Sequence, residues 1–251
     1  MLFSPSSKKN HEEFIYKKAK SKGKEGIVEN IDLDGFKGYV AEIASSELQE
    51  VIDSDLLRDM YAVKVINKSG MSTMFNVLQG LQCAVNHAKS KGITKKSILN
   101  ASLGGPYTKI GNGAVKAATD LGITIVVAAG NEAEDAAYYS PTSAPSSITV
   151  GAIDSSNYRT LWSDYGKVVD IFALGSDILS AGHLSDSGSV YRSGTSMAAP
   201  HVAGLAAYFM AKEGVRGSAA ITKRIISAAD TTFVGEAFDG SQHGAYNGGG
   251  K

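Results

Sequence analysis

Short apolar runs rich in β-branched residues recur along the chain from residue 61 onward. These runs lack a regular polar alternation, which is typical of strands that are buried on both faces of a sheet. We therefore predict strands of a buried sheet at these positions. They span residues 62–66, 97–103, 123–129, 148–152 and 168–172.

Helical patterns separate the first of these strands. Apolar residues recur at helical spacing over residues 74–88, and residues 114–121 form a second such pattern. Strands that alternate with helices predict an α/β fold, in which a parallel sheet is flanked by helices. Active residues of such sheets lie beyond the carboxyl ends of the strands, which here means at Gly104 and at Gly130 and Asn131.

The first 60 residues differ from the rest of the chain. Residues 1–35 are polar and rich in lysine, residues 35–43 alternate like a strand, and residues 45–52 open with a capping-box pattern that predicts a helix. We expect a small α+β unit over residues 1–58, followed by the main domain over residues 60–251.

Composition excludes several classes of protein. The 251 residues are 43% hydrophobic and carry a formal net charge of zero, so we expect a globular protein that binds neither nucleic acid nor a membrane surface. No apolar run approaches the roughly 20 residues that span a bilayer, and the first residues lack the apolar stretch of a secretory signal. Cys83 is the single cysteine, and we expect it to be a buried, inert thiol.

The strongest chemical motif covers residues 193–204, Ser-Gly-Thr-Ser-Met-Ala-Ala-Pro-His-Val-Ala-Gly. Ser196 falls where a helix begins, so its backbone N–H and the positive helix end are available to an oxyanion. A serine that merely caps a core helix is the alternative for an isolated residue. The complete string favours the chemical interpretation.

This motif resembles the nucleophile segment of subtilisin-like serine proteases (subtilases), in particular the proteinase K-like branch. The resemblance continues through residues 128–131, 139–141, 149–152 and 245–248. It implies a subtilisin-like sheet and a serine endopeptidase that acts on peptide or protein substrates through an acyl-enzyme at Ser196. It also implies an extracellular or vacuolar location.

The resemblance assigns further site residues. Asn131 matches the oxyanion-hole amide, although taken alone it could be a turn residue after Gly130. Two segments match the walls of the primary specificity pocket, and plain strand ends with turn glycines remain the alternative. These segments are Ser102, Leu103 and Gly104, and Ala128, Ala129 and Gly130.

A structural calcium ion is also implied by the resemblance. Pro145 and Ser147 match positions that supply carbonyl oxygens, and Asp170 matches the carboxylate ligand. One carboxylate with carbonyls and waters is an acceptable site for a hard cation. Asp170 could instead pair with a cationic side chain or cap a loop.

The resemblance has one large gap. The family places an Asp-Thr/Ser-Gly turn and a His-Gly-Thr-His segment between its inhibitory propeptide, which residues 1–58 resemble, and the strand that matches residues 61–66. Neither appears in this sequence. Serine is a weak nucleophile without a positioned base. His183 lies in a predicted hairpin before the nucleophile and is the candidate substitute, with a plain surface residue as the alternative. We therefore expect an impaired enzyme, or alternatively a pseudoprotease that binds peptides or inhibits a related protease.

Loss of that segment would also remove a central strand. In the family this strand lies between those that match residues 61–66 and 98–103, so we expect either an unpaired edge or a re-paired sheet.

Overall fold

A parallel sheet of four strands organises the part of the chain that the computed structural model describes, with order β3-β5-β7-β8. The described residues are 2–3, 37–38, 61–67, 69–181, 188–230 and 243–246. The strands are β3 (Ile98–Ala101), β5 (Thr124–Ala128), β7 (Ile148–Ile153) and β8 (Ile171–Leu174). Every neighbouring pair in this sheet is parallel, which confirms the predicted α/β class.

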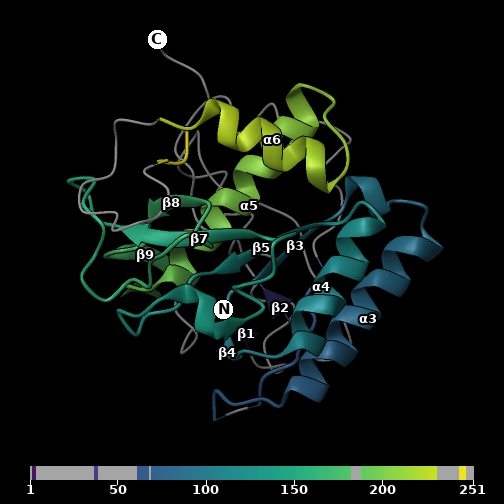
Figure 1. Ribbon diagram of the computed structural model, residues 1–251, viewed down its shortest axis with the longest axis horizontal. Coiled ribbons are helices and arrows are strands. Elements are labelled where there is room, and N and C mark those ends of the chain that lie inside the picture. Colours follow the sequence, from purple (N-terminus) through teal and green to yellow (C-terminus); the bar gives the residue numbers. More distant parts are fainter. Residues whose placement is uncertain are drawn as a thin grey trace.

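Helices cover both faces of the sheet (Figure 1). On one face lie α3 (Met74–Ser90) and α4 (Lys109–Asp120), and on the other lie α5 (Thr195–Lys212) and α6 (Ser218–Ala228). The two faces have separate cores because successive strand residues point in opposite directions. In β5, Val126 packs in the cluster with α5, whereas Ile125 and Val127 pack in the cluster with α3 and α4.

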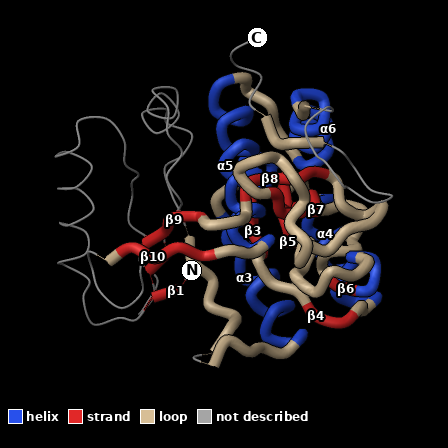
Figure 2. The backbone as a smooth tube through the Cα atoms, turned by 90° about the vertical axis from the view of Figure 1, so that its left-hand side faces the viewer, coloured by secondary structure: helices blue, strands red, loops and turns tan. Residues whose placement is uncertain are grey.

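Smaller elements lie around these layers, as the backbone trace shows (Figure 2). Short 3₁₀ helices lie at Thr94–Lys96 and Ala136–Tyr138. The antiparallel pairs are β1 (Leu2–Phe3) with β2 (Lys37–Gly38), β4 (Gly105–Pro106) with β6 (Tyr139–Ser140), and β9 (Ile178–Ala181) with β10 (Ser189–Arg192).

The predicted strand at residues 62–66 is wrong. These residues form an irregular segment that packs along α3, where a Cβ on Gly80 would lie 2.2 Å from a methyl group of Val65. A strand requires a hydrogen-bonded neighbour. The described residues supply none for this segment, and they also leave the outer edge of β3 without a paired strand.

Helix α4 and strand β8 begin a few residues away from their predicted starts. Helix α4 begins at Lys109 rather than near residue 114, because the Thr108 hydroxyl accepts a hydrogen bond from the Gly111 N–H and caps the helix earlier. Strand β8 begins at Ile171, three residues later than predicted. Of the predicted unit at residues 1–58, only the two-residue strands β1 and β2 are described; its helix lies outside the described residues.

Candidate active site

Ser196 lies in the first turn of α5, against the end of β3. Its hydroxyl donates to the Ser102 carbonyl at 3.4 Å, and the Ser102 hydroxyl donates to the Ser196 carbonyl at 3.0 Å. Pro200 explains the second bond. In an α-helix the Ser196 carbonyl would accept the N–H four residues later, but proline has no N–H. The helix therefore leaves that carbonyl to Ser102, and this reciprocal pair fixes the start of α5 on the sheet.

Asn131 approaches the same helix start from the end of β5. Its Oδ1 accepts from the Thr195 N–H at 2.8 Å and from the Thr195 hydroxyl at 3.1 Å. The Thr195 hydroxyl, which is fully buried, also accepts from the Gly130 N–H at 3.1 Å. With Oδ1 engaged in this way, the amide nitrogen of Asn131 makes no hydrogen bond to a described residue. That amino group is the part of Asn131 that remains for a ligand.

Both predicted walls of the specificity pocket lie next to the Thr142 hydroxyl. The Thr142 hydroxyl donates to the Ala128 carbonyl at 2.9 Å and lies 3.7 Å from the position of a Cβ on Gly104. Ser102 and Leu103 are half-buried, Gly104 is exposed, and Ala128 and Ala129 are buried. The alanines can therefore contribute their backbone, rather than their side chains, to any pocket between the walls.

Asp164 holds the turn that follows β5 through hydrogen bonds to its backbone. It is fully buried, and its Oδ1 accepts the backbone N–H groups of Glu132 at 2.9 Å and Glu134 at 3.0 Å. Its own N–H donates to the Gly130 carbonyl at 3.0 Å. Burial raises the pKa of Asp164, and the two backbone N–H groups act in the opposite direction.

Two residues of this site escape prediction from sequence. Thr195 belongs to the quoted motif, but nothing in the string shows that its hydroxyl binds Asn131 rather than capping the helix. Asp164 follows Ser163 in a loop without a period or spacing that would indicate a buried carboxylate.

The candidate calcium residues lie around the start of β7. Ser147 is buried, Pro145 is exposed, and one carboxylate oxygen of Asp170 accepts the Thr149 N–H at 2.8 Å. Burial raises the pKa of Asp170 to about 6, and the Thr149 N–H acts against this shift. A half-buried carboxyl with a single backbone donor fits a hard cation, although the described residues contain no group of three or more His, Cys, Asp or Glu side chains able to hold a metal.

No described histidine bonds to the Ser196 hydroxyl. His201 is turned away and pairs its Nδ1 with the Met197 carbonyl at 2.8 Å; burial lowers its pKa, against the effect of this bond. His87 is half-buried, with its ring centroid 4.2 Å from that of Tyr61. His183 lies outside the described residues.

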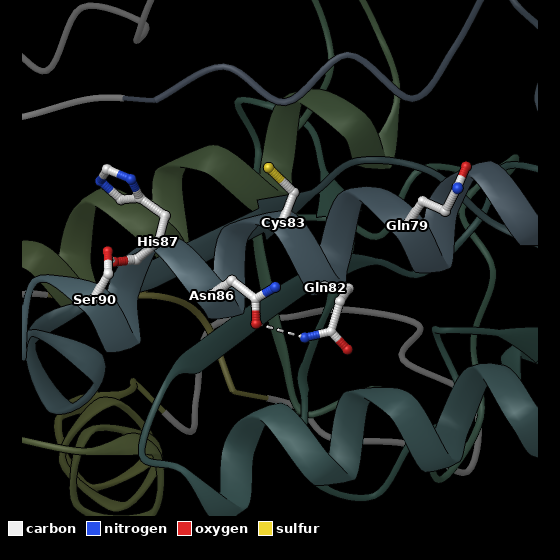
Figure 3. A pocket seen from close by; sticks show the side chains of 6 residues that line it. All are labelled: Gln79, Gln82, Cys83, Asn86, His87 and Ser90. Carbon is white, nitrogen blue, oxygen red and sulfur yellow. Dashed lines mark hydrogen bonds between the residues drawn. The ribbon is translucent and has the colours of Figure 1, made fainter.

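The exposed side of α3 borders an open hollow of about 660 Å³ (Figure 3). Its described lining includes Cys83 and His87, and also Gln82, which donates to Asn86 at 2.8 Å. Cys83 is exposed, so the expectation of a buried thiol is wrong. It lies on a face of α3 that points away from the core residues Val85 and Ala88.

These contacts place a serine hydroxyl at a helix N-terminus, beside a side-chain amide, at the carboxyl end of a parallel sheet. This is the arrangement of nucleophile and oxyanion donor in serine hydrolases. The sequence model described as "Subtilase family" matches residues 58–245. The chain therefore belongs to the subtilase family.

Individual relatives agree with this assignment. Alkaline protease 1 of Aspergillus clavatus is 47% identical over 190 residues, which cover 76% of this chain and 47% of that protein. Alkaline protease 1 of Aspergillus oryzae is 41% identical over 239 residues, covering 95% and 58%. A solved structure of a cold-adapted subtilisin-like serine proteinase superposes with a TM-score of 0.70 at 34% identity, covering 75% of this chain and 67% of that one.

The chain thus spans about half the length of the curated relatives that it matches. Among the described helices, none has the length and apolar character of a membrane span.

Proposed function

We propose that this chain is a subtilase-type serine endopeptidase site of reduced activity, acting on peptide or protein substrates. The observation that carries the proposal is the position of Ser196 at the start of α5, with Asn131 held beside it by Thr195. Ser196 would attack the scissile carbonyl to form an acyl-enzyme. The side-chain amino group of Asn131 and the helix N-terminus would donate to the oxyanion.

We expect reduced activity because no described side chain is placed to act as the base. The Ser196 hydroxyl is bonded to a backbone carbonyl, and no described histidine or carboxylate takes its proton. Base and orienter together contribute about 10⁴- to 10⁶-fold in turnover, while oxyanion donors and binding alone retain about 10³- to 10⁴-fold over water. An extracellular or vacuolar location and a calcium ion at Pro145, Ser147 and Asp170 belong to the same proposal.

Turnover of an apolar chromogenic peptide by the purified chain tests this proposal. We expect a rate at least about 10³-fold below that of an intact subtilase, and loss of the remainder in Ser196→Ala. A rate within tenfold of the intact enzyme that depends on Ser196 would reveal an unrecognised base. The second candidate is a pseudoprotease. It predicts that Ser196→Ala still binds the peptide, or inhibits an added subtilase, with no Ser196-dependent turnover in the original chain.

A further inference from the structure

The turn that carries Asn131 wraps closely around the Asp164 carboxyl group. Gly130 adopts φ +121°, and a Cβ at this position would lie 2.1 Å from Oδ2 of Asp164 and 2.9 Å from Oε2 of Glu132. Oxygens of two different carboxyl groups therefore border the same point. Only glycine leaves space for both of them.

The two carboxyl groups have unequal surroundings. Oε2 of Glu132 accepts the Asn131 backbone N–H at 2.7 Å, and the Glu132 side chain is exposed to water. Oδ2 of Asp164 is buried and has no hydrogen-bond partner among the described residues. A buried, unpartnered carboxylate oxygen beside a second carboxylate is unfavourable, and a proton removes the conflict. That proton belongs on Asp164, because water already solvates Glu132.

Neighbouring charges favour the same protonation state. Glu134 lies on the same turn, and its carboxylate accepts the Tyr139 hydroxyl at 2.8 Å, which is the main reason why the pKa of Tyr139 rises to about 12. Asp135 lies beside Gly166 on the next loop. Arg159 also lies near this turn and donates to the Ser163 carbonyl at 2.6 Å. The negative charge of Glu132 adds to the effect of burial in raising the pKa of Asp164.

We propose that Asp164 carries a proton on Oδ2 and donates it to the Glu132 carboxylate, and that this carboxyl pair positions Asn131 beside Ser196. The resulting network runs from Asp164 to Glu132, from Glu132 to the Asn131 N–H, and from Asn131 Oδ1 to Thr195. Asp164 and Glu132 are thus positioning residues that never touch substrate. Their effect on catalysis rests on the proposed function, whereas the shared proton does not.

NMR titration of the whole chain tests the shared proton directly. With ¹³C-labelled carboxyl groups, we expect Asp164 to titrate at higher pH than exposed aspartates, and the Asn131 backbone amide to shift with the same midpoint. Asp164→Asn should hold the Asn131 amide near its low-pH position at every pH, because the asparagine NH₂ is a permanent donor to Glu132. Glu132→Gln should lower the Asp164 midpoint, since it removes the facing negative charge.

Asp154→Asn is the matched control. Oδ1 of Asp154 also accepts two backbone N–H groups, those of Ser156 and Tyr158, so this variant removes the same kind of carboxylate from another loop. It should leave the Asn131 titration unchanged. An Asp164 midpoint at or below that of exposed aspartates, or an Asn131 amide that ignores the titration of Asp164, overturns the proposal.

Hydrolysis of an activated aryl ester measures the effect on the site. In the original chain, Ser196-dependent turnover should fall as Asp164 loses its proton. In Asp164→Asn the corresponding fall should disappear, while Asp164→Ala should lose at least about tenfold at every pH. A pH profile that Asp164→Asn leaves unchanged refutes the positioning role. Absence of any Ser196-dependent turnover, together with the expected NMR titration, would refute the proposed function and leave the carboxyl pair intact.

Discussion

Replacement of Thr195 by valine removes a single hydroxyl from the centre of the site. Valine keeps the shape of threonine and the backbone N–H that donates to Asn131 at 2.8 Å. It loses the hydroxyl that contacts Asn131 Oδ1 and accepts the Gly130 N–H, both at 3.1 Å. Because Thr195 is fully buried, water cannot replace these bonds.

The expected cost follows from the groups that are left without a partner. A buried donor that loses its acceptor costs about 1–3 kcal/mol, and here the Gly130 N–H is that donor. We therefore expect Thr195→Val to lower the free energy of unfolding by about 2 kcal/mol. Thr195→Ser keeps the hydroxyl and loses one methyl group, which should cost about 1 kcal/mol.

Urea unfolding of the three proteins gives this comparison, and NMR of the Asn131 side-chain amide reports the local effect. The amide resonances should move in Thr195→Val and stay in place in Thr195→Ser. If the valine variant is as stable as the serine variant, with unmoved Asn131 resonances, the hydroxyl does not hold the Asn131 side chain and our reasoning about this contact fails.

Three further predictions concern stability. The pKa of Asp170 is raised to about 6, so the folded state binds the proton of this carboxyl more tightly than the unfolded state does. The free energy of unfolding should therefore fall by up to about 3 kcal/mol as pH rises from about 4 to about 6. Asp170→Asn should flatten this part of the urea-unfolding profile, and calcium at neutral pH should stabilise only the unsubstituted chain; a variant with the same profile would contradict the assignment. Gly151→Ala should destabilise the chain by at least about 1–3 kcal/mol, because its Cβ would lie 2.3 Å from the fully buried Phe172 ring. Gly113→Ala, on the exposed side of α4 with no atom within 4 Å, should instead stabilise it by up to about 1 kcal/mol in the same assay.

The sequence pattern predicted the sheet well where tertiary packing and local preference agree. The run at residues 123–129 contains β5, whose residues are all buried. The β-branched side chains of β5 pack alternately into the cores on the two faces of the sheet. The run at residues 62–66 has equally good strand residues but failed, because β-structure depends on a neighbour that composition cannot reveal. The same argument, applied to the absent segment, predicted either an unpaired edge or a re-paired sheet, and among the described residues the outer edge of β3 has no paired strand.

For the site, the motif could predict which elements meet but not how they are held. The structure brings Ser196, Asn131 and Ser102 together, as expected from strand ends that share one edge of a parallel sheet. The bonds through Thr195 and the burial of Asp164 depend on side-chain geometry, which no spacing in the sequence specifies. The catalytic, pocket-wall and calcium roles stay predictions.

The reciprocal bond between Ser102 and Ser196 also has a kinetic consequence. It joins residues 94 positions apart, and Asn131 reaches Thr195 across 64 positions. Contacts between such distant segments form only after large loops have closed, so they slow folding and belong to its later stages. The site residues therefore reach their places only when β3, β5 and α5 have docked. A chain arrested shortly before that step would retain every residue of the site in sequence and yet have no site.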